Sequence, residues 1–140
     1  MLLHVVARGK LGRSPEAELL VRYEKRLSWP FRHSELPEVG GKVADPLTPS
    51  RTVLLDERGK TLSSEEFAAV LGRWRDEGVR ETRFVLGAAD GHSDGERAAA
   101  DLLLAMGAMT WPHLLARAML MEQLYRATSI LAGHPYHRSG

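Results

Sequence analysis

The chain has 140 residues, of which 44% are hydrophobic and 26% charged, and this balance suits a single globular domain over residues 1–140. It contains no cysteine, which excludes a disulfide framework and cysteine ligands for a metal. The formal net charge is +1, too small for a domain that binds duplex nucleic acid by bulk attraction. Any nucleic-acid partner therefore needs a local patch, and we expect no DNA partner.

The chain begins with MLLHVVARGK, an apolar run without the preceding basic region or the following cleavage site of a signal peptide. No apolar stretch reaches the length of a membrane span. We therefore expect a cytoplasmic protein with no membrane partner.

The first 50 residues alternate short apolar runs with one amphipathic stretch. Residues 2–7 predict a strand, and residues 33–39 predict a second, weaker one. Between them a serine–proline pair begins a predicted helix over residues 14–28, because serine caps a helix and proline suits its first position. Residues 40–50 are rich in glycine and proline and predict a loop.

The middle of the chain repeats the alternation. Residues 51–56 and 83–87 predict strands. Residues 63–78 and 94–106 predict helices, each opened by a serine with a glutamate three positions later. Residues 107–111 fit no element clearly. Strands separated by helices predict an α/β fold, with a mostly parallel sheet and helices on both faces.

The longest helical pattern begins after Pro112 and ends at Gly133. Its apolar residues are Leu114, Leu115, Met119, Leu120, Met121, Leu124, Tyr125, Ile130 and Leu131. They cover more than the stripe that packs on one sheet. A central helix within one domain is the alternative, but a chain this short has little material to cover both faces. We therefore predict a homodimer on helix 113–132, with Met121 and Leu124 as candidates for its interface.

Several common site motifs are incomplete in this sequence. RGKT at residues 58–61 resembles the end of a phosphate-binding P-loop, but Leu54 stands where that motif requires glycine. The first strand is not followed by a G-x-G-x-x-G dinucleotide fingerprint, and no G-x-S-x-G elbow is present. His134 and His137 have no nearby carboxylate or cysteine in the sequence, so we expect no metal site.

Three segments should meet where the parallel strands end: those after strands 51–56 and 83–87, and residues 106–111. Ligands of open α/β sheets bind at this edge. Glycines here let backbone groups approach a flat ligand, and apolar side chains supply walls. The residues concerned are Gly87, Gly91, Gly107, Leu54, Leu55, Met106 and Met109. They predict a pocket for a nucleoside-like group, although glycines at strand ends are often simply turns.

The last residues, AGHPYHRSG at 132–140, are dense in groups that stack, exchange protons and hold phosphate. One interpretation is a docked tail whose aromatic ring covers part of the core. The other is a functional tail whose direction is set by the helix stop and by Pro135. The tail alone does not decide between them.

Four stretches together resemble one known family closely. They are LLDERGKTLSSEEFA (54–68), FVLGAADG (84–91), AMTWPHLLARAMLMEQLYRA (108–127) and ILAGHPYHR (130–138). The chain is similar in these stretches to the ribosomal RNA large subunit methyltransferase H family. Members of this family methylate N3 of pseudouridine 1915 in the 23S rRNA of the large ribosomal subunit.

The resemblance implies a SPOUT-type α/β knot, in which the C-terminal segment forms a trefoil knot. It also implies S-adenosyl-L-methionine (SAM) as methyl donor, an obligate homodimer and 23S rRNA as partner. Transferred residue by residue, the implied cofactor contacts are Leu55, Gly87, Met106, Gly107, Ala108, Met109, Thr110 and Trp111.

The transfer of a methyl group to pseudouridine N3 requires removal of the N3 proton, so a base or a stabilising cation helps. The tail offers His137 as base, Arg138 for phosphate or developing charge, and Tyr136 for stacking. His113 is a second candidate base. Arg117 and Arg126 are candidates for RNA contact or for ion pairs in the dimer.

Two departures from the family pattern keep alternatives open. Ala88 stands where similar sequences commonly have a second glycine, and residues 38–50 look about one helix shorter than usual. The alternatives are a SAM-binding SPOUT relative that acts on another RNA such as tRNA, and a catalytically silent ribosome-binding module. The sequence leaves open whether the substrate is free rRNA, a subunit or the assembled ribosome.

Overall fold

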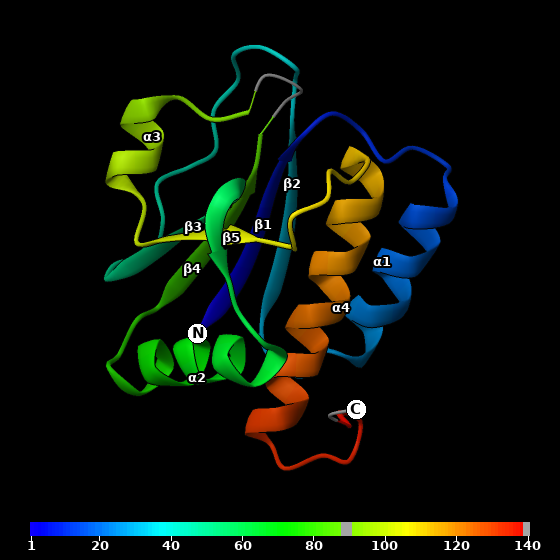
Figure 1. The fold of residues 1–140 in the computed structure, drawn as a ribbon, viewed down its shortest axis with the longest axis vertical. Helices are drawn as coiled ribbons and strands as arrows, with labels where there is room; N and C mark the ends of the chain where they lie inside the picture. Colours follow the sequence, from blue (N-terminus) through cyan, green and yellow to red (C-terminus); the bar gives the residue numbers. More distant parts are fainter. Residues whose placement is uncertain (88–90, 139–140) are drawn as a thin grey trace.

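The computed structural model describes residues 1–87 and 91–138. In this part of the chain five strands form one parallel sheet in the order β2-β1-β4-β3-β5 (Figure 1). The strands are β1 (Leu2–Arg8), β2 (Phe31–Leu36), β3 (Ser50–Thr61), β4 (Glu81–Leu86) and β5 (Leu102–Ala105). The predicted α/β class with a parallel sheet is confirmed. Because the strands are parallel, their carboxyl ends and the loops that follow share one edge of the sheet.

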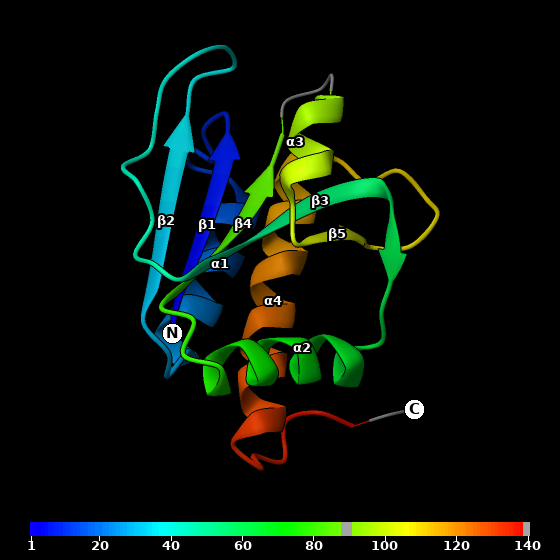
Figure 2. The ribbon, with the colours of Figure 1, turned by 90° about the vertical axis from the view of Figure 1, so that its left-hand side faces the viewer.

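The helices are α1 (Pro15–Arg26), α2 (Ser64–Asp76), α3 (Asp94–Ala99) and α4 (His113–Leu131). In Figure 2, α1 and α4 lie behind the sheet and α3 lies in front of it, so both faces carry helices. The predicted caps are present. Ser14 accepts the N–H of Ala17, and Ser63 and Ser93 each form a full capping box.

One apolar cluster joins the sheet to three of the helices. Leu3, Val53 and Phe84 supply the strand side, Leu71 comes from α2, and Leu120 from α4. All five side chains are completely buried. This core fixes α1, α2 and α4 on the sheet, whereas no residue of α3 is buried.

The helix predicted over residues 94–106 is wrong in its second half. The chain leaves α3 at Ala100, whose backbone is extended, and continues as β5. Asp101 begins this pairing: its carboxylate accepts the N–H of Thr52 at 2.8 Å, and its own N–H donates to the carbonyl of Thr52 at 2.9 Å. Leucine and alanine favour a helix locally, but pairing with β3 prevails.

Strand β3 is longer than the predicted residues 51–56, because it pairs with β5 on both sides of an irregularity between Leu55 and Lys60. The predicted loop over residues 40–50 is confirmed, apart from Ser50, which begins β3.

Part of the wide apolar surface on α4 packs inside the single chain. Met121 and Leu124 are 0% exposed within the single chain, where α4 packs against α1, α2 and the sheet. Both are therefore core residues, and their assignment to a dimer interface is wrong. None of the helices in the described residues is long and apolar enough to span a membrane. The trefoil knot stays a prediction.

Candidate functional site

A cavity of about 530 Å³ opens at the carboxyl edge of the sheet. Its walls come from the turn within β3, the loop after β4, residues 106–112 and the first turn of α4. Seven of the eight predicted cofactor residues line it: Leu55, Gly87, Met106, Gly107, Met109, Thr110 and Trp111. Ala108 is exposed and does not line the cavity. The structure thus brings together residues that are up to 56 positions apart, from Leu55 to Trp111.

The pocket that was predicted from the ends of the parallel strands differs from the structure at one residue. Gly91 lines the cavity as expected, but Leu54 is buried in β3 and does not. Leu54 and Leu55 are neighbours on a strand, so their side chains point to opposite faces, and only one can reach the cavity. Ala88, the departure from the family pattern, lies outside the described residues.

The glycines of the cavity wall are there for steric reasons. Gly107 has φ of +100°, a conformation that other residues rarely adopt. A Cβ at Gly87 would lie 3.1 Å from the carbonyl oxygen of Gly91, closer than an ordinary van der Waals contact, so Gly91 would have to shift by a few tenths of an ångström. Trp111 bonds back across the segment 106–111 that precedes α4: its indole N–H donates to the carbonyl of Met106 at 3.0 Å. Met109 is 76% exposed at the rim.

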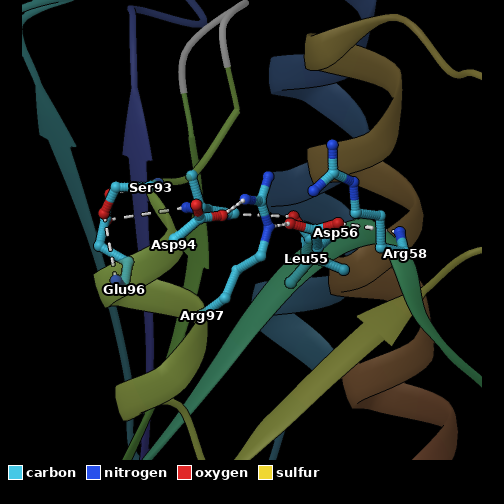
Figure 3. Close-up of polar contacts among 8 residues, drawn as sticks. Leu55, Asp56, Arg58, Ser93, Asp94, Glu96 and Arg97 are labelled. Atoms are coloured by element: carbon cyan, nitrogen blue, oxygen red, sulfur yellow. Dashed lines mark hydrogen bonds and ion pairs between the residues drawn. The ribbon is translucent and has the colours of Figure 1, made fainter.

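A network of ion pairs and hydrogen bonds, which the sequence did not predict, supports one wall of the cavity (Figure 3). Arg97 of α3 donates through Nε to Asp56 Oδ2 at 2.7 Å and through Nη1 to Asp94 at 3.1 Å. The backbone N–H of Arg58 donates to Asp56 Oδ1 at 2.8 Å. Burial alone would raise the pKa of Asp56, but these two donors hold it below its ordinary value. Asp56 is therefore charged at neutral pH and ties the turn within β3 to α3.

Tyr136, the first of the predicted catalytic residues, is docked on α4. Its hydroxyl donates to Glu122 Oε1 at 2.9 Å, and its ring meets that of Tyr125 edge-on at 4.6 Å. The guanidinium of Arg126 lies 4.8 Å from the ring centre and also donates to Glu122. Burial and the carboxylate of Glu122 raise the pKa of Tyr136 to about 12, so the phenol keeps its proton.

The imidazole of His137 lies between a carboxylate and a guanidinium. Its Nε2 is 2.7 Å from Glu65 Oε1 on α2, and its Nδ1 is 3.0 Å from Nη1 of Arg126. A guanidinium only donates, so Nδ1 accepts and the proton of a neutral ring is on Nε2, directed at Glu65. The hydrogen bond from His137 lowers the pKa of Glu65. The lone pair that a general base needs is thus occupied by Arg126 in this arrangement. Arg138 is exposed.

The cavity and the tail lie at opposite ends of α4. His113 and Ala116, in its first turns, line the cavity, whereas Tyr136 and His137 follow its last turn. The tail folds back along the helix, with Tyr136 on Glu122 and His137 on Glu65, but none of its described residues lines the cavity. Within one chain, the predicted catalytic residues and the predicted cofactor residues are therefore not brought together.

The other candidate cations have partners within the chain. Arg117 is 1% exposed and bonds Glu35 on β2, so its prediction as an RNA or dimer contact is wrong. Arg126 holds Glu122 and the tail. His113 is exposed at the cavity and stays a candidate base. The network of Glu122, Arg126 and Tyr136 was not predicted, because no motif relates positions 10 to 14 apart on either side of a helix stop.

Comparison with known proteins agrees with this architecture. A family model described as "Predicted SPOUT methyltransferase" matches residues 1–137. Proteins named ribosomal RNA large subunit methyltransferase H match over the full length of both chains, with 74% identity in Erythrobacter litoralis and 70% in Novosphingobium aromaticivorans. The protein of that name from Brucella abortus is 43% identical over 169 aligned positions. The first relative aligns over 140 residues, so the short form is shared. The chain belongs to the SPOUT methyltransferase family.

Proposed function

We propose that this chain is a SAM-dependent methyltransferase that methylates N3 of pseudouridine 1915 in the 23S rRNA of the large ribosomal subunit, with residues 1–140 as one SPOUT domain. The observation that carries the proposal is the convergence of seven implied cofactor residues on one cavity at the sheet edge where α/β folds bind ligands. The relatives that match over the full length carry the corresponding name.

The residues of the cavity fit SAM. The volume of the cavity lies within the range of small-molecule sites, roughly 300–1,000 Å³. Leu55, Leu86 and Met106 offer apolar surface to an adenosyl group, and the backbone at Gly87 and Gly107 is open to hydrogen bonding. These residues and the segment 106–111 would hold the cofactor, which supplies a methyl group on a positively charged sulfur.

The chain's own residues have to position the acceptor and remove its N3 proton. We assign stacking on the base to Tyr136, proton removal to His137 and phosphate or developing charge to Arg138. His137 can accept the proton at Nδ1 once Arg126 withdraws from that atom. His113, which already borders the cavity, is the alternative base.

A homodimer supplies what one chain lacks. None of the described tail residues, Tyr136 to Arg138, lines the cavity of its own chain, so we assign the tail to the cavity of a partner. The interface cannot use Met121 or Leu124, which are buried. The apolar residues Leu114, Leu115 and Met119 of α4 are partly exposed and remain available to it. We also propose a cytoplasmic location, because the proposed substrate is ribosomal.

The test is transfer of tritiated methyl from SAM to ribosomes that lack this modification, followed by mapping of the labelled base. We expect label at N3 of one pseudouridine of 23S rRNA. Parallel reactions with free 23S rRNA, large subunits and whole ribosomes identify the substrate form. Label in tRNA alone would favour a SPOUT enzyme with another RNA substrate, and ribosome binding without any transfer would favour a silent binding module.

A further inference from the structure

The loop after β1, residues 9–14, begins beside the cavity. Ala7 on β1 pairs with Leu86 on β4, so Arg8 stands opposite Gly87, which lines the cavity. Neighbouring strands lie about 4.8 Å apart. The loop therefore starts one strand spacing from the cavity wall, although none of its own residues lines the cavity.

A buried arginine fixes this loop. Arg117 follows the cavity-lining Ala116 on α4, and its Nη2 donates to the carbonyl oxygens of Arg8 and Gly9, each at 3.2 Å. Its Nη1 donates to Glu35 Oε2 at 2.7 Å, and the same carboxylate oxygen accepts the N–H of Leu11 at 2.7 Å. One cation and one carboxylate thus hold the chain at Arg8, the end of β1, and at Gly9 and Leu11 in the loop.

The free-energy cost of burying the charge of Arg117 indicates that its ion pair with Glu35 does more than stabilise the fold. Arg117 is 1% exposed, and among the described residues its Nε finds no hydrogen-bond partner. Buried ion pairs add little net stability, because the loss of hydration offsets the attraction. What the pair does achieve is a fixed loop next to the cavity.

The fixed loop presents two cations to solvent. Lys10 and Arg13 are exposed, and within residues 1–87 and 91–138 neither forms an ion pair with a carboxylate. Gly9 and Gly12, with φ of +89° and +58°, turn the chain on either side of Lys10. Glu35 is already engaged by Arg117, and Glu38 lies against Gly9.

A third cation stands on the other side of the cavity. Arg58 lines it from the turn within β3, is exposed, and has no ion pair in the described part of the chain. The strand order places β4, and hence Gly87, between β1 and β3. The loop that carries Lys10 and Arg13 therefore begins on one side of Gly87, and Arg58 lines the cavity on the other side.

We propose that Lys10, Arg13 and Arg58 form an RNA-backbone contact surface that holds phosphates of the substrate RNA on either side of the cavity. This proposal rests on the proposed function and names the surface that its substrate would use. Phosphate contacts position a nucleic acid without reading its sequence. With a net charge of only +1, the chain has to concentrate such contacts locally. A fixed loop holds them in register with the cavity at little entropic cost on binding.

The experiment compares Lys10→Gln and Arg13→Gln with Lys25→Gln, a control that removes an equal charge from the exposed far end of α1. Filter binding to protein-free 23S rRNA is measured over a salt series, alongside SAM titration and the ribosome KM. For each loop variant we expect several-fold weaker RNA binding and a salt slope lower by about one. SAM affinity should not change, and the KM for ribosomes should rise. Glu38→Gln should strengthen binding.

RNA binding and salt slopes equal to those of Lys25→Gln would overturn the proposal. So would a rise in ribosome KM without any loss of binding to protein-free rRNA, because the partner would then be an acidic ribosomal protein. If the wild-type chain methylates no ribosomes, the proposed function fails, while the filter-binding comparison still decides the contact surface.

Discussion

At the scale of single residues, the tail is held by Glu122. One carboxylate oxygen, Oε1, accepts from the hydroxyl of Tyr136 at 2.9 Å and from Nε and Nη2 of Arg126 at 2.9 and 2.6 Å. Arg126 in turn occupies Nδ1 of His137. Hydrogen bonds with a charged partner are the strong ones. Glu122 therefore sets the position of the tail. Through Arg126 it also determines that Nδ1 of His137, the residue that we assign as base, is occupied as an acceptor.

The charge of Glu122 has a direct signature in the phenol of Tyr136. Ionised Tyr136 would place an anion beside the carboxylate, which together with burial raises its pKa to about 12. For Glu122→Gln, which keeps a similar shape, we expect this pKa to fall by roughly one unit. The measurement is absorbance titration of the tyrosines, with Tyr136→Phe identifying the transition. An unchanged midpoint would show that Glu122 does not contact the phenol.

At the scale of elements, the sequence predicts the helix starts well, because a serine cap is a local signal. It fails where long-range pairing decides. Residues 102–104 are leucines that suit a helix as well as a strand, and only pairing with β3 makes them β5. On α4, Met121 and Leu124 fail in the same way as interface candidates, since packing inside the chain already buries them.

The same contrast between sequence pattern and long-range pairing applies to the candidate site. Leu55, Gly87 and residues 106–111 converge because loops after parallel strands must share an edge, and both the spacing and the family resemblance indicate this. The bracing pair Asp56–Arg97 joins positions 41 apart, and Arg117–Glu35 joins positions 82 apart. Charged residues are abundant in the sequence, so no pattern selects these partners before the fold is known.

The close approach of β3 and β5 gives an element-scale prediction at Gly59. A Cβ there would lie 2.5 Å from backbone atoms of Leu103, which cannot move without breaking the pairing. We expect Gly59→Ala to lower the free energy of unfolding by about 1–3 kcal/mol, the usual cost of overpacking. Urea unfolding measures this. Gly95→Ala is the control, since its nearest atom is 3.9 Å away and alanine suits a helix better. Equal stability of the two variants would contradict this packing.

At the scale of the whole molecule, one chain does not bring the two halves of the proposed site together. The cavity lies at the start of α4 and the described tail residues do not line it, so the proposed catalysis by both uses two chains. Tyr136 also packs on Tyr125, which makes the tail a docked end in its own chain and a candidate catalytic group toward a partner. The two interpretations of the tail are therefore compatible.

Ending the chain at Pro135 separates the two roles. The core, the cavity and the partly exposed apolar residues of α4 do not include the removed residues, so dimerisation and SAM affinity should persist. We expect single-turnover methylation of ribosomes to fall by at least about a hundredfold, the scale of lost acid–base catalysis. Light scattering and a SAM titration on the same samples provide the controls. Methylation at the wild-type rate would leave the tail only a docked end.

Subunit mixing shows whether one chain's cavity works with its partner's tail. Gly87→Leu adds a bulky side chain to the cavity wall, where even a Cβ would lie 3.1 Å from the carbonyl oxygen of Gly91, and ending the chain at Pro135 removes the tail. Each homodimer should be inactive. Random assortment of co-expressed chains gives half mixed dimers, each with one intact cavity facing one intact tail, so activity should return to about a quarter of wild type. No recovery in mixed dimers of proven composition would contradict this pairing of cavity and tail.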